Sequence, residues 1–174
     1  VLTMGTLYYP PNADGIRWFL QEAFPIIRRV LPQVKLTIVG KNPPADFLQA
    51  AGESGGSIVV TGYVPDINPY FEDAAAMVIP VRAGGGMPVP ILEAFARGMP
   101  VVTTTVGLEG IQAEPGSDVL VADSPDEFAQ AAIRLLNDRD MQARLSNNGR
   151  RLANARYDWQ VVLGQLEKVY ESLA

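Results

Sequence analysis

The chain has 174 residues, of which 48% are hydrophobic and 19% are charged, as is ordinary for one globular domain with a full hydrophobic core. A formal net charge of -5 argues against a nucleic-acid-binding surface, because such surfaces carry clustered Lys and Arg. The absence of cysteine and histidine excludes disulfides, thiolate chemistry, Ser-His-Asp catalysis and histidine-bound zinc within this chain. No apolar run approaches the roughly 20 residues of a membrane-spanning helix, and we expect a cytoplasmic protein.

Six short segments have the apolar or alternating pattern of β-strands, in chain order at residues 1–4, 35–39, 57–61, 76–80, 101–104 and 119–121. Helical periodicity lies between most of them. Asn12 or Asp14 is placed to cap a first helix over about residues 15–30. Further helices are expected after Pro44, at 67–71, from near Pro88, after Ser124, from Asp138 and, as an amphipathic closing helix, over 158–174. This alternation predicts an α/β fold, a doubly wound parallel six-stranded sheet with helices on both faces.

In such a sheet, ligands bind outside the carboxyl ends of the strands, where the strand order reverses. The loops expected at those ends contain Gly5, Gly40, Gly62, Gly84 and Gly107. This distribution favours one shared cleft along the edge of the sheet. The alternative, that each glycine only forms a turn, stays open for any single loop.

The most informative segment is 76–104, which predicts a buried strand, a loop of three consecutive glycines at 84–86, a helix from near Pro88 and a second buried strand. Glycines let backbone N–H groups approach a phosphate, and the helix is expected to add unpaired N–H groups and a positive dipole end. Glu93 falls about a turn and a half into the helix, within reach of a sugar diol. A flexible glycine loop and a solvated glutamate are the alternatives, but the helix around Glu93 is otherwise apolar, so its charge needs a partner.

The order of this glycine loop and three later motifs resembles the nucleotide-sugar-binding half of glycosyltransferase family 4, the retaining group 1 enzymes with two facing Rossmann-like domains. The motifs that carry the resemblance are 3–5, 39–40, 61–64, 91–96, 98–102, 107–110 and 157–159. The resemblance implies the C-terminal half of a two-domain GT-B architecture, with 1–174 as a single donor-binding domain. Because a buried strand is predicted at residues 1–4, we expect an excised C-terminal domain whose N-terminal acceptor-binding domain is absent.

The same resemblance assigns roles to particular residues. It implies that Glu93 binds the donor ribose, that backbone amides of the glycine loop hold the diphosphate, and that the backbone around Val64 meets the base, with Asp66 nearby. The remaining donor-binding candidates are Gly5, Gly84, Gly85, Gly86 and Met87, with Arg82 and Lys41 as the nearest cations. In this family the sugar is transferred with retention and the leaving diphosphate assists the acceptor, so no metal or other cofactor is expected and no catalytic residue is assigned here.

The resemblance further implies a role in cell-envelope polysaccharide biosynthesis. The partners it implies are a nucleotide-sugar donor and the chain's own N-terminal domain, against which the closing helix packs. Peripheral membrane contact through that domain is left open.

The chain departs from the family pattern where charge on the leaving diphosphate is usually neutralised. Pro88 and Pro90 stand near the positions of the usual arginine and lysine, and the first glycine loop offers Thr6 and Asn12 in place of two further cations. An acidic residue common in the family is replaced by Gly85. Two hypotheses follow, a glycosyltransferase domain and a non-catalytic nucleotide-binding or scaffold module. A phosphoacceptor receiver domain is set aside, because residues 5–9 include no carboxylate.

Overall fold

The computed structural model describes residues 1–84 and 86–164 and contains a parallel sheet of six strands. The strands are β1 (Leu2–Met4), β2 (Leu36–Val39), β3 (Ile58–Gly62), β4 (Met77–Ile79), β5 (Val101–Thr103) and β6 (Leu120–Val121). Their spatial order is β3-β2-β1-β4-β5-β6, so the direction of winding reverses between β1 and β4. All six predicted strands are present, and the predicted doubly wound fold is confirmed.

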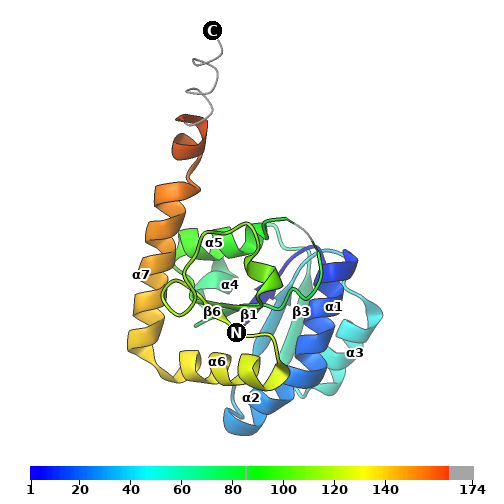
Figure 1. Ribbon diagram of the computed structural model, residues 1–174. Helices are drawn as coiled ribbons and strands as arrows, with labels where there is room; N and C mark the ends of the chain where they lie inside the picture. Colours follow the sequence, from blue (N-terminus) through cyan, green and yellow to red (C-terminus); the bar gives the residue numbers. More distant parts are fainter. Residues whose placement is uncertain (85, 165–174) are drawn as a thin grey trace.

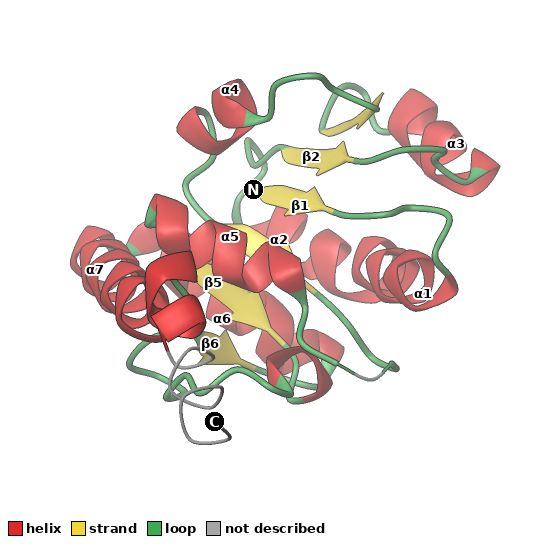
Figure 2. Cartoon of the chain, turned by 90° about the horizontal axis from the view of Figure 1, so that it is seen from above, coloured by secondary structure: helices red, strands yellow, loops and turns green. Residues whose placement is uncertain are grey.

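Helices cover both faces of this sheet. They are α1 (Pro10–Trp18), the π-helix η1 (Phe19–Ala23), α2 (Phe24–Val30), α3 (Ala45–Glu53), α4 (Asn68–Glu72), α5 (Val89–Arg97), the 3-10 helix η2 (Val106–Leu108), α6 (Pro125–Asn137) and α7 (Arg139–Arg156). In Figure 2, α4, α5 and α7 lie on one side of the strands, with α1 and α3 on the other.

Alternate side chains of each strand fill two separate cores, as the two-residue period of a strand requires. On β4, Val78 belongs to the core beneath α1, α2 and α6, while Met77 and Ile79 belong to the core beneath α4, α5 and α7. In the first core the rings of Phe19 and Phe128 pack edge to face with centroids 5.7 Å apart. Burial on both faces explains why the inner strands are mostly apolar, whereas β3 at the edge of the sheet is only partly buried.

The first helix begins earlier than predicted, at Pro10 instead of about residue 15, and the expected caps do not cap it. Tyr9 is the N-cap residue, and Pro10 and Pro11 occupy the first turn, where a missing N–H costs nothing. The Asn12 amide instead donates to the Thr6 carbonyl at 3.2 Å. The helix widens into the π segment η1 just before Pro25, a residue that cannot donate to the preceding turn.

Two glycines allow the elements around the reversal point to approach closely. A Cβ atom at Gly15 of α1 would lie 1.9 Å from the Pro80 carbonyl oxygen, and one at Gly40 would lie 2.0 Å from the Gly5 carbonyl oxygen. Real Cβ atoms do not approach backbone that closely. These glycines therefore set how near α1 lies to the end of β4 and how near the loops after β1 and β2 lie to each other.

From α7 to residue 164 the described chain is largely helical and runs past the body of the domain (Figure 1). After α7 it turns at Tyr157 and Asp158, and residues 159–164 are helical. Trp159 is 77% exposed, and Val162 and Leu163 are also exposed. Residues 165–174 of the predicted closing helix lie outside the described residues, so that helix is confirmed only over its first part. No helix in the described ranges combines the length and apolar character needed to cross a membrane.

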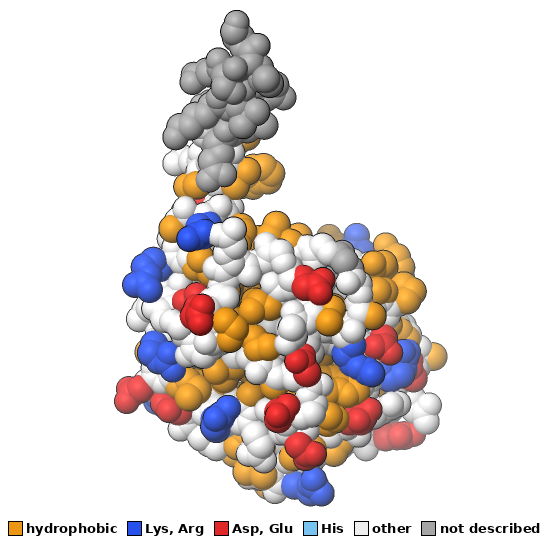
Figure 3. All heavy atoms as spheres, in the orientation of Figure 1, with side chains coloured by type: hydrophobic (Ala, Val, Ile, Leu, Met, Phe, Trp, Pro, Cys, Tyr) orange, Lys and Arg blue, Asp and Glu red, His pale blue; other side chains and the backbone are white. Residues whose placement is uncertain are grey.

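Acidic and basic side chains are mixed over the face of the molecule seen in Figure 3. Two arginines of α7 donate to backbone carbonyls, Arg144 to that of Gly116 and Arg150 to that of Arg97. These side chains tie α7 to neighbouring elements instead of forming a free cationic surface.

Candidate functional site

A cleft of about 740 Å³ opens where the carboxyl ends of β1 to β4 meet the start of α5. This is the point at which the strand order reverses, where open α/β sheets bind their ligands. Its lining comes from five segments: Met4, Gly5, Thr6, Tyr8, Tyr9 and Asn12; Val39, Gly40 and Lys41; Tyr63, Val64, Pro65 and Ile67; Ile79 and Val81; and Pro88, Val89, Pro90 and Glu93. The predicted shared cleft is therefore present for the loops after β1, β2 and β3, whereas Gly84, Gly107 and the described residues next to them do not line it.

The structure brings four of the candidate donor-binding residues together in this cleft, namely Glu93, Gly5, Lys41 and Val64. Five others lie outside its lining, namely Gly84, Gly86, Met87, Asp66 and Arg82. Gly85 lies outside the described residues. The binding roles of all ten remain predictions.

Glu93 lines the cleft from α5, and it lies outside the buried face of that helix. Its neighbours Ile91, Ala94 and Phe95 are buried, and their positions anchor one face of the helix in the core. The Glu93 side chain keeps 32% of its surface exposed and pairs with Arg97, whose Nη2 donates to Oε1 at 3.2 Å. The expectation that this charge has a partner is confirmed.

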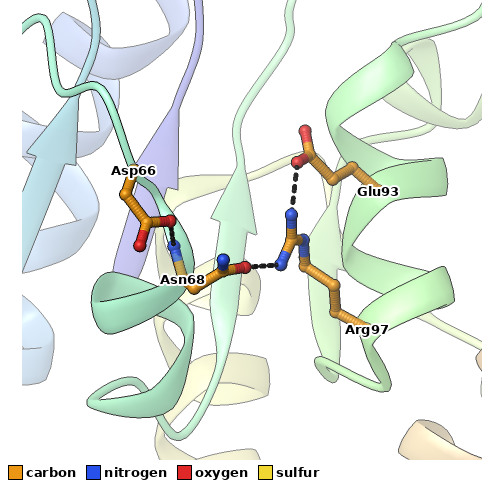
Figure 4. A network of polar contacts seen from close by, with 4 residues as sticks. All are labelled: Asp66, Asn68, Glu93 and Arg97. Atoms are coloured by element: carbon orange, nitrogen blue, oxygen red, sulfur yellow. Dashed lines mark hydrogen bonds and ion pairs between the residues drawn. The ribbon is translucent and has the colours of Figure 1, made fainter.

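Arg97 continues this contact into a network that reaches the start of α4 and the loop after β3 (Figure 4). Its Nη1 donates to the Asn68 side-chain oxygen at the start of α4, and its guanidinium lies 4.6 Å from the centre of the Phe71 ring. The Asn68 backbone N–H in turn donates to Asp66 Oδ1 at 2.9 Å. Asp66 therefore fixes the start of α4, and the same network holds the loop after β3.

The glycine loop has the backbone shape that its sequence predicts but lies beside the cleft. Gly84 and Gly86 have φ values of 135° and 101°, in the left-handed region that favours glycine. A Cβ at Gly84 would lie 3.8 Å from the Pro11 side chain, and one at Gly110 would lie 3.4 Å from the Met87 side chain. The loop thus runs between the start of α1 and the turn that ends at Gly110.

The start of α5 offers fewer free amides than expected. Pro88 is the N-cap residue, Pro90 has no N–H, and the Ile91 N–H already donates to the Pro88 carbonyl at 3.0 Å. The expectation that this helix presents several unpaired N–H groups is therefore wrong at two of its first three positions. An anion here would depend on the Val89 amide, the helix dipole and the neighbouring loop.

The two candidate cations differ in their surroundings. Arg82 points to Asp14, with 3.6 Å between Nη1 and Oδ2, and lies 5.6 Å from the Trp18 ring. Lys41 lies in the cleft, with Nζ 4.6 Å from the centre of the Tyr63 ring. Lys41 and Glu93 are the charged side chains among the described residues of the lining.

Sequence reasoning missed several residues of the site. Tyr8, Tyr9 and Tyr63 are 63%, 50% and 65% exposed, and together they form an aromatic rim around the cleft. No local pattern marks such a rim, since it depends on two loops meeting in space. Arg97 was detectable, because it lies four residues after Glu93 and such pairs face each other on a helix.

A doubly wound sheet with a cleft at its reversal point places the chain in the Rossmann-like class of α/β domains. A family model described as "Glycosyl transferases group 1" matches residues 1–138. The chain belongs to this family of glycosyltransferases.

Known proteins of related sequence or fold agree with this assignment. The chain is 28% identical over 178 residues to a phosphatidyl-myo-inositol mannosyltransferase of Mycolicibacterium smegmatis, covering 100% of this chain and 45% of that protein. The C-terminal domain of the group 1 protein LpcC from Francisella tularensis matches its fold with a TM-score of 0.76 at 19% identity, over 91% of this chain and 86% of that one. Anabaena Alr3699/HepE in complex with UDP matches with a TM-score of 0.81 at 18% identity, and the match covers 98% of this chain and 48% of that one.

Two conclusions follow from these matches. The predicted fold class, the C-terminal half of the GT-B architecture, is confirmed. The chain spans less than half the length of the mannosyltransferase relative.

Proposed function

We propose that this chain is the donor-binding domain of a glycosyltransferase and holds a nucleoside-diphosphate sugar in the cleft at the ends of β1 to β4. Glu93 accepts hydrogen bonds from the ribose hydroxyls, and the backbone around Val64 meets the base. Amides of the loop at 84–87 face the diphosphate. The proposal depends on one observation. In a domain of this family, the Glu93 carboxylate lines the cleft at the point where the strand order reverses.

The substrate class is supported by what related proteins are named for. The relative from M. smegmatis is a phosphatidyl-myo-inositol mannosyltransferase, and the HepE structure contains UDP. A carboxylate for a vicinal diol and backbone amides for a diphosphate are the pairings that such a donor requires. Both guanosine and uridine diphosphates are therefore candidates for the nucleotide part.

In the proposed reaction the sugar passes to an acceptor hydroxyl with retention of configuration. The bond between the anomeric carbon and the diphosphate breaks, the bond to the acceptor oxygen forms on the same face, and the acceptor proton moves to an oxygen of the leaving diphosphate. No protein base or metal takes part. An N-terminal domain supplies the acceptor and any membrane contact on the cytoplasmic side, so the chain alone binds donor without turning it over.

A second candidate is a non-catalytic binding or scaffold module with a degenerate phosphate site. Pro88 and Pro90 in the cleft wall favour it, because they supply neither a cation nor an N–H where negative charge would develop. The pairing of Arg82 with Asp14 also favours it, since this removes a further cation from the phosphates. This candidate shares the donor cleft but not the transfer step.

The test is calorimetric titration of the 174-residue chain with GDP and with UDP. We expect saturable binding of at least one of them and a loss of about tenfold or more in Glu93→Ala, since hydrogen bonds to a charged group contribute about 1.5 to 3 kcal/mol. Glu22→Ala, which removes an exposed helical carboxylate outside the cleft lining, is the matched control and leaves affinity unchanged.

The outcomes separate the two candidates. The absence of saturable binding at millimolar GDP and UDP overturns the donor-binding proposal and favours the scaffold module. Saturable, Glu93-dependent binding supports the donor cleft. If the protein that includes its N-terminal domain then transfers sugar, the enzyme is supported. If that protein transfers no sugar, the non-catalytic module is supported.

A further inference from the structure

We propose that Arg97 is a positioning residue for donor recognition, which holds the Glu93 carboxylate and the loop after β3 in one fixed arrangement so that ribose and base are bound together. The inference rests on the proposed function, because it concerns how that cleft recognises a nucleotide. Arg97 itself is not in the cleft lining, so its effect passes through Glu93 and Asn68.

The first argument is that one guanidinium joins Glu93 of the cleft lining to Asn68, the residue directly after the lining residue Ile67. Its Nη2 donates to Glu93 Oε1 at 3.2 Å on α5, and its Nη1 donates to Asn68 Oδ1 at the start of α4. Glu93 lies in the wall where ribose is proposed to bind, while Asn68 follows the segment around Val64 proposed to meet the base. The planar fork of arginine suits this double contact, whereas the single ammonium of lysine does not.

The second argument is that Arg97 is itself held in place from two sides. Its guanidinium stacks 4.6 Å from the centre of the Phe71 ring, which is buried, and its backbone carbonyl accepts a hydrogen bond from Arg150 Nη2 at 2.9 Å. Only 33% of its side-chain surface remains exposed. Stacking on an aromatic face and a fixed main chain leave the guanidinium little freedom.

The third argument concerns what remains free on Glu93. Arg97 occupies Oε1, and the described residues supply no hydrogen bond to Oε2. That oxygen is left to accept from a ribose hydroxyl. A glutamate without this contact samples several rotamers, and binding a diol must then restrict them, which weakens binding by about three- to tenfold.

The experiment compares nucleotides that have and lack the ribose diol. Wild type, Arg97→Ala, Arg97→Lys and Glu93→Gln are titrated with GDP, UDP and their 2′,3′-dideoxy forms. We expect Arg97→Ala to weaken binding of the ribonucleotides by about three- to tenfold more than binding of the dideoxy forms, because the dideoxy forms make no use of Glu93 and lose only what the loop after β3 contributes through the base. The ribonucleotide affinity of Arg97→Lys is expected to lie between those of wild type and the alanine variant, since a lysine keeps the positive charge but lacks the planar fork of donors.

A matched control separates positioning from charge. Arg151→Ala removes an arginine of α7 that is exposed and donates to Asn148, away from the cleft lining, and it leaves all affinities unchanged. The double variant Arg97→Ala with Glu93→Gln shows no ribose-specific loss beyond that of Glu93→Gln, because both changes act on one contact.

Three results overturn the proposal. Equal weakening of ribose and dideoxy nucleotides by Arg97→Ala means that the residue acts through stability or general charge. If Arg97→Ala leaves ribonucleotide affinity unchanged while Glu93→Gln still weakens it, Arg97 has no positioning role, and the proposal of a donor cleft is retained. A wild-type chain that binds no nucleotide overturns this inference together with the proposed function.

Discussion

Asn68 and Glu93 lie 25 residues apart in the sequence, yet both accept hydrogen bonds from the guanidinium of Arg97. The contact fastens the start of α4 to the middle of α5, on the face of the sheet that carries the second core. α5 lines the cleft, and α4 directly follows the loop after β3, which lines it too. The contact therefore ties the position of Glu93 to the position of that loop.

Cations restored at the start of α5 are expected to strengthen diphosphate binding. Pro88 and Pro90 both line the cleft, and the variant Pro88→Arg with Pro90→Lys places two positive groups beside the expected phosphate position. We expect GDP and UDP to bind about tenfold more tightly or better, with nucleoside affinity unchanged, as measured by titration at low salt.

The control for this variant adds the same charge elsewhere. Val30→Lys with Val59→Lys replaces two exposed side chains outside the cleft lining and changes the net charge equally. A similar gain in both variants means that the net charge is responsible. No gain in the proline variant means that phosphates bind away from the start of α5.

Close packing at Gly15 predicts opposite effects of two glycine-to-alanine changes in helices. The Cβ of Gly15→Ala meets the Pro80 carbonyl oxygen at 1.9 Å, and backbone on both sides prevents relief, so we expect a loss of about 2 to 4 kcal/mol in the free energy of unfolding. Gly52→Ala on α3 meets nothing within 4 Å and is expected to stabilise by about 0.5 to 1 kcal/mol. Urea unfolding of both variants checks the prediction, and a loss in both contradicts it.

The ion pair between Arg17 and Asp46 makes stability depend on pH. Arg17 Nε donates to Asp46 Oδ2 at 2.6 Å and Nη2 donates to Oδ1 at 3.2 Å, and the Arg17 hydrogen bonds lower the Asp46 pKa below its ordinary value of 3.8. A lowered carboxylate pKa stabilises the fold above the ordinary value, and this contribution is lost as the pH falls through the pKa of the folded state. Because both side chains are well exposed, we expect Asp46→Asn to cost only about 0.5 to 1 kcal/mol at pH 7.

A double-mutant cycle with Arg17→Ala and Asp46→Asn measures this coupling by urea unfolding. At pH 7 we expect a favourable coupling free energy between the two side chains. This coupling should decrease below pH 3.8 as Asp46 takes up a proton. It should also weaken in molar salt, since the pair is screened by solvent ions. A coupling that is equal at both pH values shows that the ion pair does not contribute through its charge.

Most of the fold was predictable because its signals are local. Each buried parallel strand is a short apolar run bounded by polar or turn-forming residues, so all six strands appear where the sequence places them. The start of the first helix was not predictable in this way. Pro10 and Pro11 suggest a loop when taken alone, and only their place in the first turn makes them compatible with a helix.

The site was predictable only in part, because only some of its signals are local in the sequence. Glu93 is marked by its apolar neighbours and lies in the cleft, whereas the path of the glycine loop depends on contacts with Pro11 and Gly110, far away in the sequence. The contact between Arg97 and Asn68 spans 29 residues and follows from how α4 packs beside α5. Sequence spacing determines a partner one helical turn away, but not one on a neighbouring helix.

The N-cap of α6 is a feature that the sequence predicts and the structure confirms, and it permits a graded test. Ser124 Oγ accepts from the Glu127 N–H at 3.3 Å and donates to the Glu127 carboxylate at 2.8 Å. Ser124→Ala removes both contacts, and we expect it to lower the free energy of unfolding by about 1 kcal/mol, while Ser124→Gly costs only a few tenths. Urea unfolding at pH 7 measures both, and an alanine variant as stable as the glycine variant contradicts a capping role for this hydroxyl. Because α6 covers the core that contains Phe128, the loss should appear in the single global transition and not as local fraying.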